Sequence, residues 1–102
     1  MDRLQGLQDI LTQDPTNKMA RYGLAMEYSG RNEVEQALSE FEKLITQDAD
    51  FANAYFMAAQ TLAKVERLDD ARSMLQRGIQ SAQRTSNRHA ESEMQAMLDE
   101  LS

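Results

Sequence analysis

Few residues of this chain have the types and spacing that chemistry requires. His89 and Glu93 stand four positions apart, so on a helix they would share one face and could hold a metal ion together. Such a pair on a polar helix surface is usually only solvated, and His89 is the only histidine. Residues 48–50, Asp-Ala-Asp, resemble the start of a calcium-binding loop, but neither the turn glycine nor the closing glutamate follows. The sequence therefore predicts no catalytic residue, no metal site and no cofactor.

Composition narrows the classes of protein that remain. The 102 residues include no cysteine, which excludes a disulfide framework, a thiol nucleophile and a zinc–thiolate site. A formal net charge of -6 without a lysine or arginine cluster argues against binding to nucleic acid or to an anionic membrane. The acidic start of the chain is not typical of a signal peptide, and no segment reaches the apolar length of a membrane span. A cytoplasmic protein without enzymatic activity is expected.

An internal repeat organises the rest of the chain. A shift of 34 residues aligns identical residues without a gap: Ala20 with Ala54, Ala25 with Ala59, Ala37 with Ala71, and Ile45 with Ile79. Within each unit apolar residues recur at helical spacing, first over residues 20–28 and 54–62, then over residues 34–45 and 68–79. Each unit is therefore expected to contain two helices joined by a short turn.

Amphipathic segments flank the two units. Residues 3–13 have the pattern of the second helix of a preceding half-unit, and residues 87–101 have one apolar and one charged face, as the closing helix of a stack needs. In the first turn, Asn32 with Glu35 three residues later predicts a capping box, and Asp50 is placed to cap the first helix of the second unit. The sequence thus predicts an all-α fold of about five helices.

The repeat resembles the tetratricopeptide repeat (TPR), a 34-residue helix–turn–helix motif. The residues that carry the resemblance are Leu24, Ala25, Tyr28, Ala37 and Phe41 in the first unit and Tyr55, Ala58, Ala59, Leu62, Ala71 and Leu75 in the second. The resemblance implies an α-α superhelix of antiparallel helical hairpins and a single TPR domain over residues 1–102. Its parts would be an N-terminal helix or half-repeat at 2–14, repeats at 18–51 and 52–85, and a capping helix at 86–102.

Four residues depart from the family pattern. Two of them, Ala49 and Gln83, replace the proline at the boundary between units. Arg21 stands where the family usually has tryptophan or another large apolar residue, and Gly78 stands where a small alanine is usual. The alanines at 25, 37, 59 and 71 are still expected to let paired helices approach closely. The departures bear on the angles between stacked helices and leave the expected fold unchanged.

The first helix of the first unit carries a second apolar stripe. Ala20 and Leu24 belong to the stripe that packs within and between repeats, whereas Met19, Tyr22 and Met26 point away from it. In TPR proteins the first helix of each hairpin lines the concave surface. The resemblance therefore implies a partner-binding groove formed by Met19, Tyr22, Met26, Asn53, Phe56, Gln60 and Lys64.

The same surface lacks a feature known from part of the family. Some TPR co-chaperones bind an acidic C-terminal tail with a clamp of lysine, asparagine and arginine on the concave face. The corresponding positions here are Tyr22, Met26 and Met57, so the clamp is absent. The groove is therefore not expected to favour the acidic tails of the large cytosolic chaperones.

Several interpretations of the apolar stripe stay open. The leading one is a protein–protein interaction or scaffold module that binds an apolar or amphipathic peptide or helix of a partner, because methionines adapt and aromatic rings anchor. A second is self-association into a homodimer through the same stripe. An enzyme or metal protein has the least support. A purely structural explanation competes with all of these: neighbouring helices or the closing helix would cover Tyr22, Met26 and Phe56.

Overall fold

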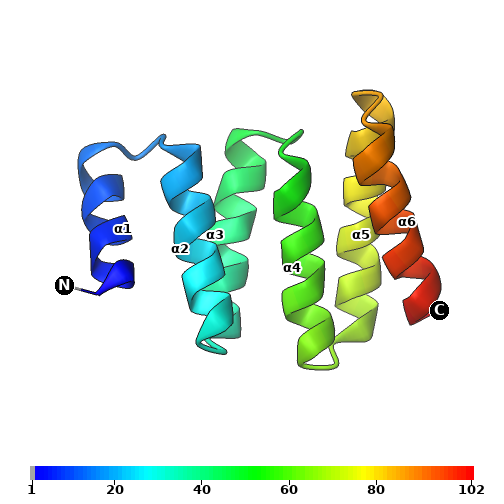
Figure 1. Ribbon diagram of the computed structural model, residues 1–102, viewed down its shortest axis with the longest axis horizontal. Helices are drawn as coiled ribbons and strands as arrows, with labels where there is room; N and C mark the ends of the chain where they lie inside the picture. The colour runs from blue at the N-terminus through cyan, green and yellow to red at the C-terminus, as the bar shows by residue number, and fades with distance from the viewer. Residues whose placement is uncertain (1) are drawn as a thin grey trace.

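Six α-helices follow one another in the computed structural model, which describes residues 2–102 (Figure 1). They are α1 (Arg3–Gln13), α2 (Lys18–Gly30), α3 (Val34–Gln47), α4 (Ala52–Lys64), α5 (Leu68–Arg84) and α6 (Arg88–Leu101). No strand occurs in this range. The predicted all-α fold is confirmed, with six helices where about five were expected. None of the helices between residues 2 and 102 is long and apolar enough to cross a membrane.

The helices stack as antiparallel hairpins, as the repeat predicted. Each helix packs against the next along the chain, and α4 also contacts both α2 and α6. In the view of Figure 1 these three helices lie in front of α3 and α5, and the two ends of the chain lie at opposite ends of the stack. The molecule measures 40 × 29 × 17 Å. Its front face is therefore built from the first helix of each hairpin and from α6.

The interior is built from residues that recur at the 34-residue interval. Two pairs of alanines related by this interval are completely buried: Ala25 with Ala59, and Ala37 with Ala71. Their size lets the backbones of paired helices approach closely, as expected. The large residues Phe41 and Leu75, also 34 positions apart, are completely buried as well. Burying each such side chain stabilises the fold by about 1.5–3 kcal/mol.

The turns within the two hairpins contain a left-handed residue. Asn32 has φ of 60° and Glu66, 34 positions later, has φ of 63°. The residue before α3 is Glu33, and its side chain makes no capping hydrogen bond. Its amide instead donates to the Tyr28 carbonyl, which satisfies an acceptor at the end of α2. The predicted capping box of Asn32 and Glu35 is wrong, because asparagine tolerates the left-handed conformation and is used here to end α2.

The predicted cap at Asp50 is also wrong. The residue that precedes α4 is Phe51, and no side chain caps this helix. The Asp50 Oδ1 atom instead accepts hydrogen bonds from Ser81 Oγ at 3.1 Å and from Arg84 Nη2 at 2.8 Å. The carboxylate therefore joins the loop between the hairpins to α5, a contact that depends on where α5 lies in space.

The two hairpins accommodate their departures from the family pattern in different ways. In the first, Arg21 Nη1 of α2 lies 2.6 Å from Glu40 Oε1 of α3, and both side chains are largely buried. The equivalent of Arg21 in the second hairpin is Tyr55, which packs directly over Gly78. A Cβ atom added to Gly78 would lie 2.7 Å from Tyr55 Cβ. Glycine thus makes room for the tyrosine in one hairpin, and an ion pair replaces that contact in the other.

Candidate functional site

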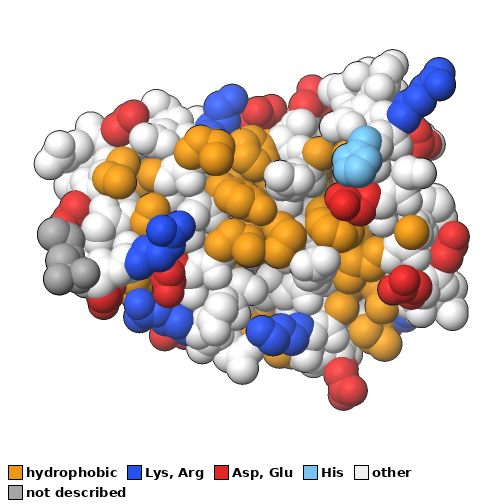
Figure 2. Space-filling model, in the orientation of Figure 1, with side chains coloured by type: hydrophobic (Ala, Val, Ile, Leu, Met, Phe, Trp, Pro, Cys, Tyr) orange, Lys and Arg blue, Asp and Glu red, His pale blue; other side chains and the backbone are white. Residues whose placement is uncertain are grey.

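Apolar side chains gather at the centre of the front face, over α2 and α4 (Figure 2). Within the described part of the chain, α6 contacts only α4 and α5 and does not reach α2. The region between α2 and α4 is therefore open on this face. The alternative in which the closing helix folds across the predicted groove is wrong, because α6 continues the stack beside α4.

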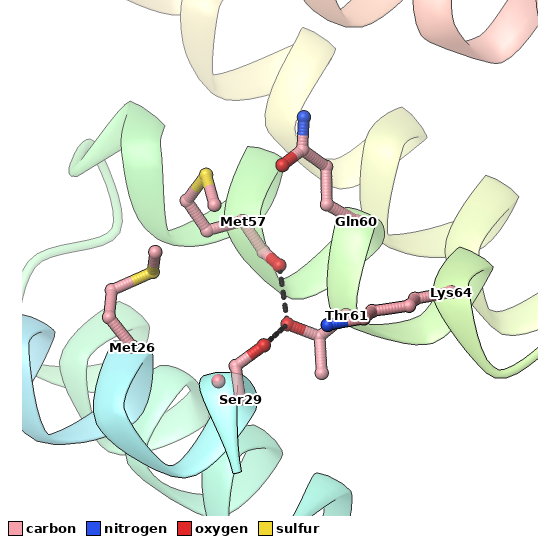
Figure 3. Close-up of a pocket in the computed structure, with 7 residues that line it drawn as sticks. Met26, Ser29, Met57, Gln60, Thr61 and Lys64 are labelled. Atoms are coloured by element: carbon pink, nitrogen blue, oxygen red, sulfur yellow. Dashed lines mark hydrogen bonds between the residues drawn. The ribbon is translucent and has the colours of Figure 1, made fainter. Parts of the chain in front are cut away.

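A pocket of about 230 Å³ lies in this region, between α2 and α4. Its lining residues are Met26, Ser29, Gly30, Met57, Gln60, Thr61 and Lys64. Figure 3 shows the side chains of Met26 and Met57 extending from the two helices toward the same opening. The part of the pocket formed by Met26 and Met57 is therefore apolar and adaptable, since a methionine side chain can adopt many shapes.

The floor of the pocket is a pair of hydroxyl groups. Thr61 Oγ1 donates to the Met57 carbonyl at 2.8 Å, and Ser29 Oγ lies 2.8 Å from Thr61 Oγ1. A hydroxyl has one hydrogen, so Ser29 is the donor between the two oxygens. Both hydroxyl hydrogens are thus used inside the protein. Among the lining side chains, the remaining hydrogen-bond donors are the Gln60 amide and the Lys64 ammonium group.

The structure brings three of the predicted groove residues together in this pocket: Met26, Gln60 and Lys64. Met19 is 68% exposed near the start of α2 and does not line it. Asn53 is exposed and lies at a separate, shallow pocket beside the loop before α4 and Asn87. The predicted residues are therefore spread along the face, and three of them meet at the pocket between the C-terminal halves of α2 and α4.

The two predicted aromatic residues are shared between surface and core. Tyr22 and Phe56 are partly buried against the hydrophobic core. The Tyr22 ring centre lies 5.6 Å from that of Phe51 and 6.4 Å from that of Phe41. Burial raises the pKa of the Tyr22 hydroxyl above its ordinary value. Part of each aromatic side chain thus serves packing, and less of it faces solvent than the stripe suggested.

Four lining residues were not among the predicted groove residues: Ser29, Gly30, Met57 and Thr61. The repeat did not point to Met57, because it aligns with Gly23, against which Leu7 of α1 packs. One signal for Met57 existed, since it occupies a position of the clamp found in some TPR co-chaperones. The Ser29–Thr61 contact had no signal, because these residues are 32 positions apart and fall outside the repeat register.

The pair of residues considered for metal binding lies on α6. His89 Nε2 is 4.0 Å from Glu93 Oε2, and the His89 side chain is 90% exposed. No cluster of three or more His, Asp or Glu side chains with the spacing of a metal site occurs in residues 2–102.

Comparison with known proteins places the chain in a family. The family model for the tetratricopeptide repeat matches residues 28–98. A TPR repeat-containing protein of Pseudomonas aeruginosa is 24% identical over 98 residues, which cover 96% of this chain and 93% of that protein. A tetratricopeptide repeat domain protein from Salinibacter ruber, solved by NMR, is 28% identical with a TM-score of 0.79, over 87% of this chain and 90% of that one.

A more distant structure has the same fold. The TPR2B domain of yeast Sti1, solved in complex with pHsp70, superposes with a TM-score of 0.85 over 96% of this chain and 78% of that one, at 15% identity. The similarity covers nearly the whole chain and concerns the fold alone. Since the family model spans most of its length, this chain belongs to the tetratricopeptide repeat family.

Proposed function

We propose that this protein acts by binding a segment of a partner protein in the groove between α2 and α4. The observation that carries the proposal is the open pocket between Met26 and Met57. Its volume of about 230 Å³ is enough for one apolar side chain of a peptide or helix. The yeast Sti1 TPR2B domain in complex with pHsp70 is an example of this fold with a protein ligand. The proposal assigns the chain no reaction of its own.

Each predicted residue has a place in this proposal. Met26, with Met57, holds an apolar side chain of the ligand, while Gln60 and Lys64 orient it. Tyr22 and Phe56 offer the exposed parts of their rings as anchors. Met19 and Asn53 contact a ligand that extends toward the start of α2 and α4. Residues 18–51 and 52–85 act as the two repeats, with 2–14 and 86–102 closing the stack, and the cytoplasmic location remains a prediction.

A displayed library of random 12-residue peptides tests the proposal. Peptides enriched on the wild-type protein are measured by fluorescence anisotropy against the double variant Met26→Gln/Met57→Gln. Glutamine keeps the length of each side chain and replaces the apolar thioether, so we expect affinity at least about tenfold lower with the helix content unchanged. The matched control is Met97→Gln, which alters a partly buried methionine on α6. It should bind the peptides as the wild type does.

Two results would overturn the proposal. One is that no peptide is enriched above a blank surface, or that the enriched peptides bind the double variant unchanged. The other comes from sedimentation velocity at micromolar concentration. A dimer that the Met26→Gln/Met57→Gln change dissociates would assign the same surface to self-association, and the proposal for a partner peptide would then be replaced.

A further inference from the structure

We infer that the ligand of this groove places a single aspartate or glutamate carboxylate on Lys64, beside an apolar side chain held between Met26 and Met57. The inference rests on the proposed function and names the class of peptide that the groove selects. It depends on three features of the described residues: the lack of an ionic partner for Lys64, the donors and acceptors of the pocket, and the length of α4 between Met57 and Lys64.

Lys64 is one of two basic residues in the described range without a carboxylate partner; the other, Arg88, lies at a separate pocket on α6, and Lys64 is the one that lines the groove. The other two lysines each have a carboxylate partner: Lys18 Nζ lies 3.0 Å from Asp48 Oδ2 and Lys43 Nζ lies 3.2 Å from Glu40 Oε2. Seven of the eight arginines are also paired. In residues 2–102 no carboxylate lies within 4.0 Å of the Lys64 ammonium group, although the chain has 17 acidic residues against 11 basic ones. Its charge is therefore left for an external partner.

The pocket itself has no acidic group to pair with Lys64. None of its lining residues is an aspartate or glutamate. Figure 3 shows the Lys64 side chain running from the end of α4 back toward the Ser29–Thr61 pair. An ammonium group beside partly apolar surface favours an incoming carboxylate more than one in bulk water does. A lysine in the last turn also complements the helix dipole of α4, but that role leaves its hydrogen-bond donors free.

The spacing along α4 sets the distance between the apolar part of the site, at Met57, and the charged part, at Lys64. Met57 and Lys64 are seven residues apart, so their Cα atoms are separated by about 10 Å along the helix axis. An extended ligand spans that distance with about three residues, and because the Lys64 side chain runs back toward Thr61, fewer residues are sufficient. A single carboxylate fits better than an acidic run, because the chain carries a net charge of -6 and would repel a polyanion.

Two displayed peptide libraries test the inference. Both have 12 residues and a fixed central leucine; one allows Asp and Glu at the other positions, and the other allows Asn and Gln instead. We expect enrichment from the acidic library, and about tenfold weaker binding when the acidic residue of an enriched peptide is changed to its amide. Lys64→Gln should weaken the acidic peptide about tenfold and leave the amide peptide unchanged. Lys43→Gln, on α3 and outside the pocket lining, should affect neither.

A charge reversal gives the sharpest result. Lys64→Glu should abolish binding of the acidic peptide and restore binding when the acidic residue of the peptide is changed to lysine. Circular dichroism spectra of the Lys64 variants should match the wild type, since this side chain is exposed. Peptides that are enriched but bind equally to the wild type and Lys64→Gln would overturn the inference and leave the proposed function standing. Enrichment from neither library would overturn both.

Discussion

The hydroxyl oxygens of Ser29 and Thr61 lie 2.8 Å apart and join α2 to α4 beneath the groove. The Thr61 side chain is buried, and its hydroxyl also donates to the Met57 carbonyl one turn earlier in α4. Two helices that belong to different hairpins are therefore connected by a polar contact directly under the pocket. This contact contributes to the width of the groove as well as to the stability of the fold.

Thr61→Val should destabilise the protein by about 1 kcal/mol in urea unfolding. Valine keeps the shape of threonine but removes the acceptor for the Ser29 hydroxyl, which is partly buried and then has no partner in the fold. Ser29→Ala is the matched second change. Because the two residues share one hydrogen bond, the double variant should lose less stability than the sum of the single variants. Additive losses would show that the contact does not couple the helices.

Gly78→Ala should destabilise the protein, although alanine favours helix formation. The added Cβ would lie 2.7 Å from Tyr55 Cβ and would also contact the Met94 sulfur. Met94 can move its flexible end, whereas the Tyr55 Cβ is fixed to the backbone of α4. We expect a net loss of about 1–2 kcal/mol in thermal or chemical unfolding, the overpacking outweighing the gain in helix propensity.

Gly6→Ala is the control for this effect. No heavy atom of a neighbouring element lies within 4 Å of a Cβ at Gly6 of α1. The change should therefore stabilise the protein by up to about 1 kcal/mol. An equal response of the two glycines would contradict the close contact between Tyr55 and α5.

Glu66→Gly should stabilise the protein by about 0.5–1 kcal/mol. Glu66 has φ of 63° in the turn between α4 and α5, a conformation that is unfavourable for a residue with a Cβ. Glycine adopts it freely, although part of the gain is offset by the greater entropy of the unfolded chain. Asn32→Gly, at the equivalent turn, should give a smaller gain because asparagine already tolerates this conformation. A loss of stability in Glu66→Gly would show that the side chain has a role outside the turn.

Tyr55→Phe should cost about 1 kcal/mol at neutral pH, because the Tyr55 hydroxyl donates to the Ala49 carbonyl at 2.6 Å. Burial also raises the pKa of this hydroxyl above its ordinary value, an effect that Arg77 and Arg84 partly oppose. With a higher pKa in the folded state, the stabilisation is present below about pH 10 and is lost as the pH rises further. The free energy of unfolding should thus fall less steeply above about pH 10 in Tyr55→Phe than in the wild type.

Tyr22→Phe separates the effect of a lost hydrogen bond from the effect of a raised tyrosine pKa. Burial raises the pKa of the Tyr22 hydroxyl as well, so this change should also reduce the alkaline loss of stability. The Tyr22 hydroxyl makes no hydrogen bond to another residue in the described range, and neutral-pH stability should change little. Guanidinium unfolding at neutral and alkaline pH checks both variants. Identical pH profiles for the wild type and both variants would refute the role of buried tyrosines.

The helices and their pairing could be predicted because they depend on local spacing. Apolar residues at three- and four-residue steps define a packing face, and small residues such as Ala25 and Ala59 mark where two helices approach. The helix ends were less predictable. Asn32 and Asp50 were expected to cap helices, but one ends α2 in a left-handed turn and the other binds α5. A short polar side chain has several possible partners, and the fold selects among them.

The predicted groove also shows what local spacing cannot determine. Periodicity identified the face on which Tyr22, Met26 and Phe56 lie, but it could not tell how far neighbouring side chains cover each of them. Phe51 packs against Tyr22 and draws part of that ring into the core. Met26 stays at the open pocket with Gln60 and Lys64. The degree of exposure depends on side chains from other helices, which a helical period does not describe.

Residue types and spacing were thus sufficient for the repeat, the all-α class of fold and the net acidic charge, and they indicate the face on which we propose that a partner binds. The tertiary structure decided that Met57, Ser29 and Thr61 complete the pocket, that α6 leaves it open and that Lys64 has no ionic partner in the described chain. The physical reason is distance. Helical periodicity acts over a few residues, whereas the space between α2 and α4 is set by packing among residues more than 30 positions apart.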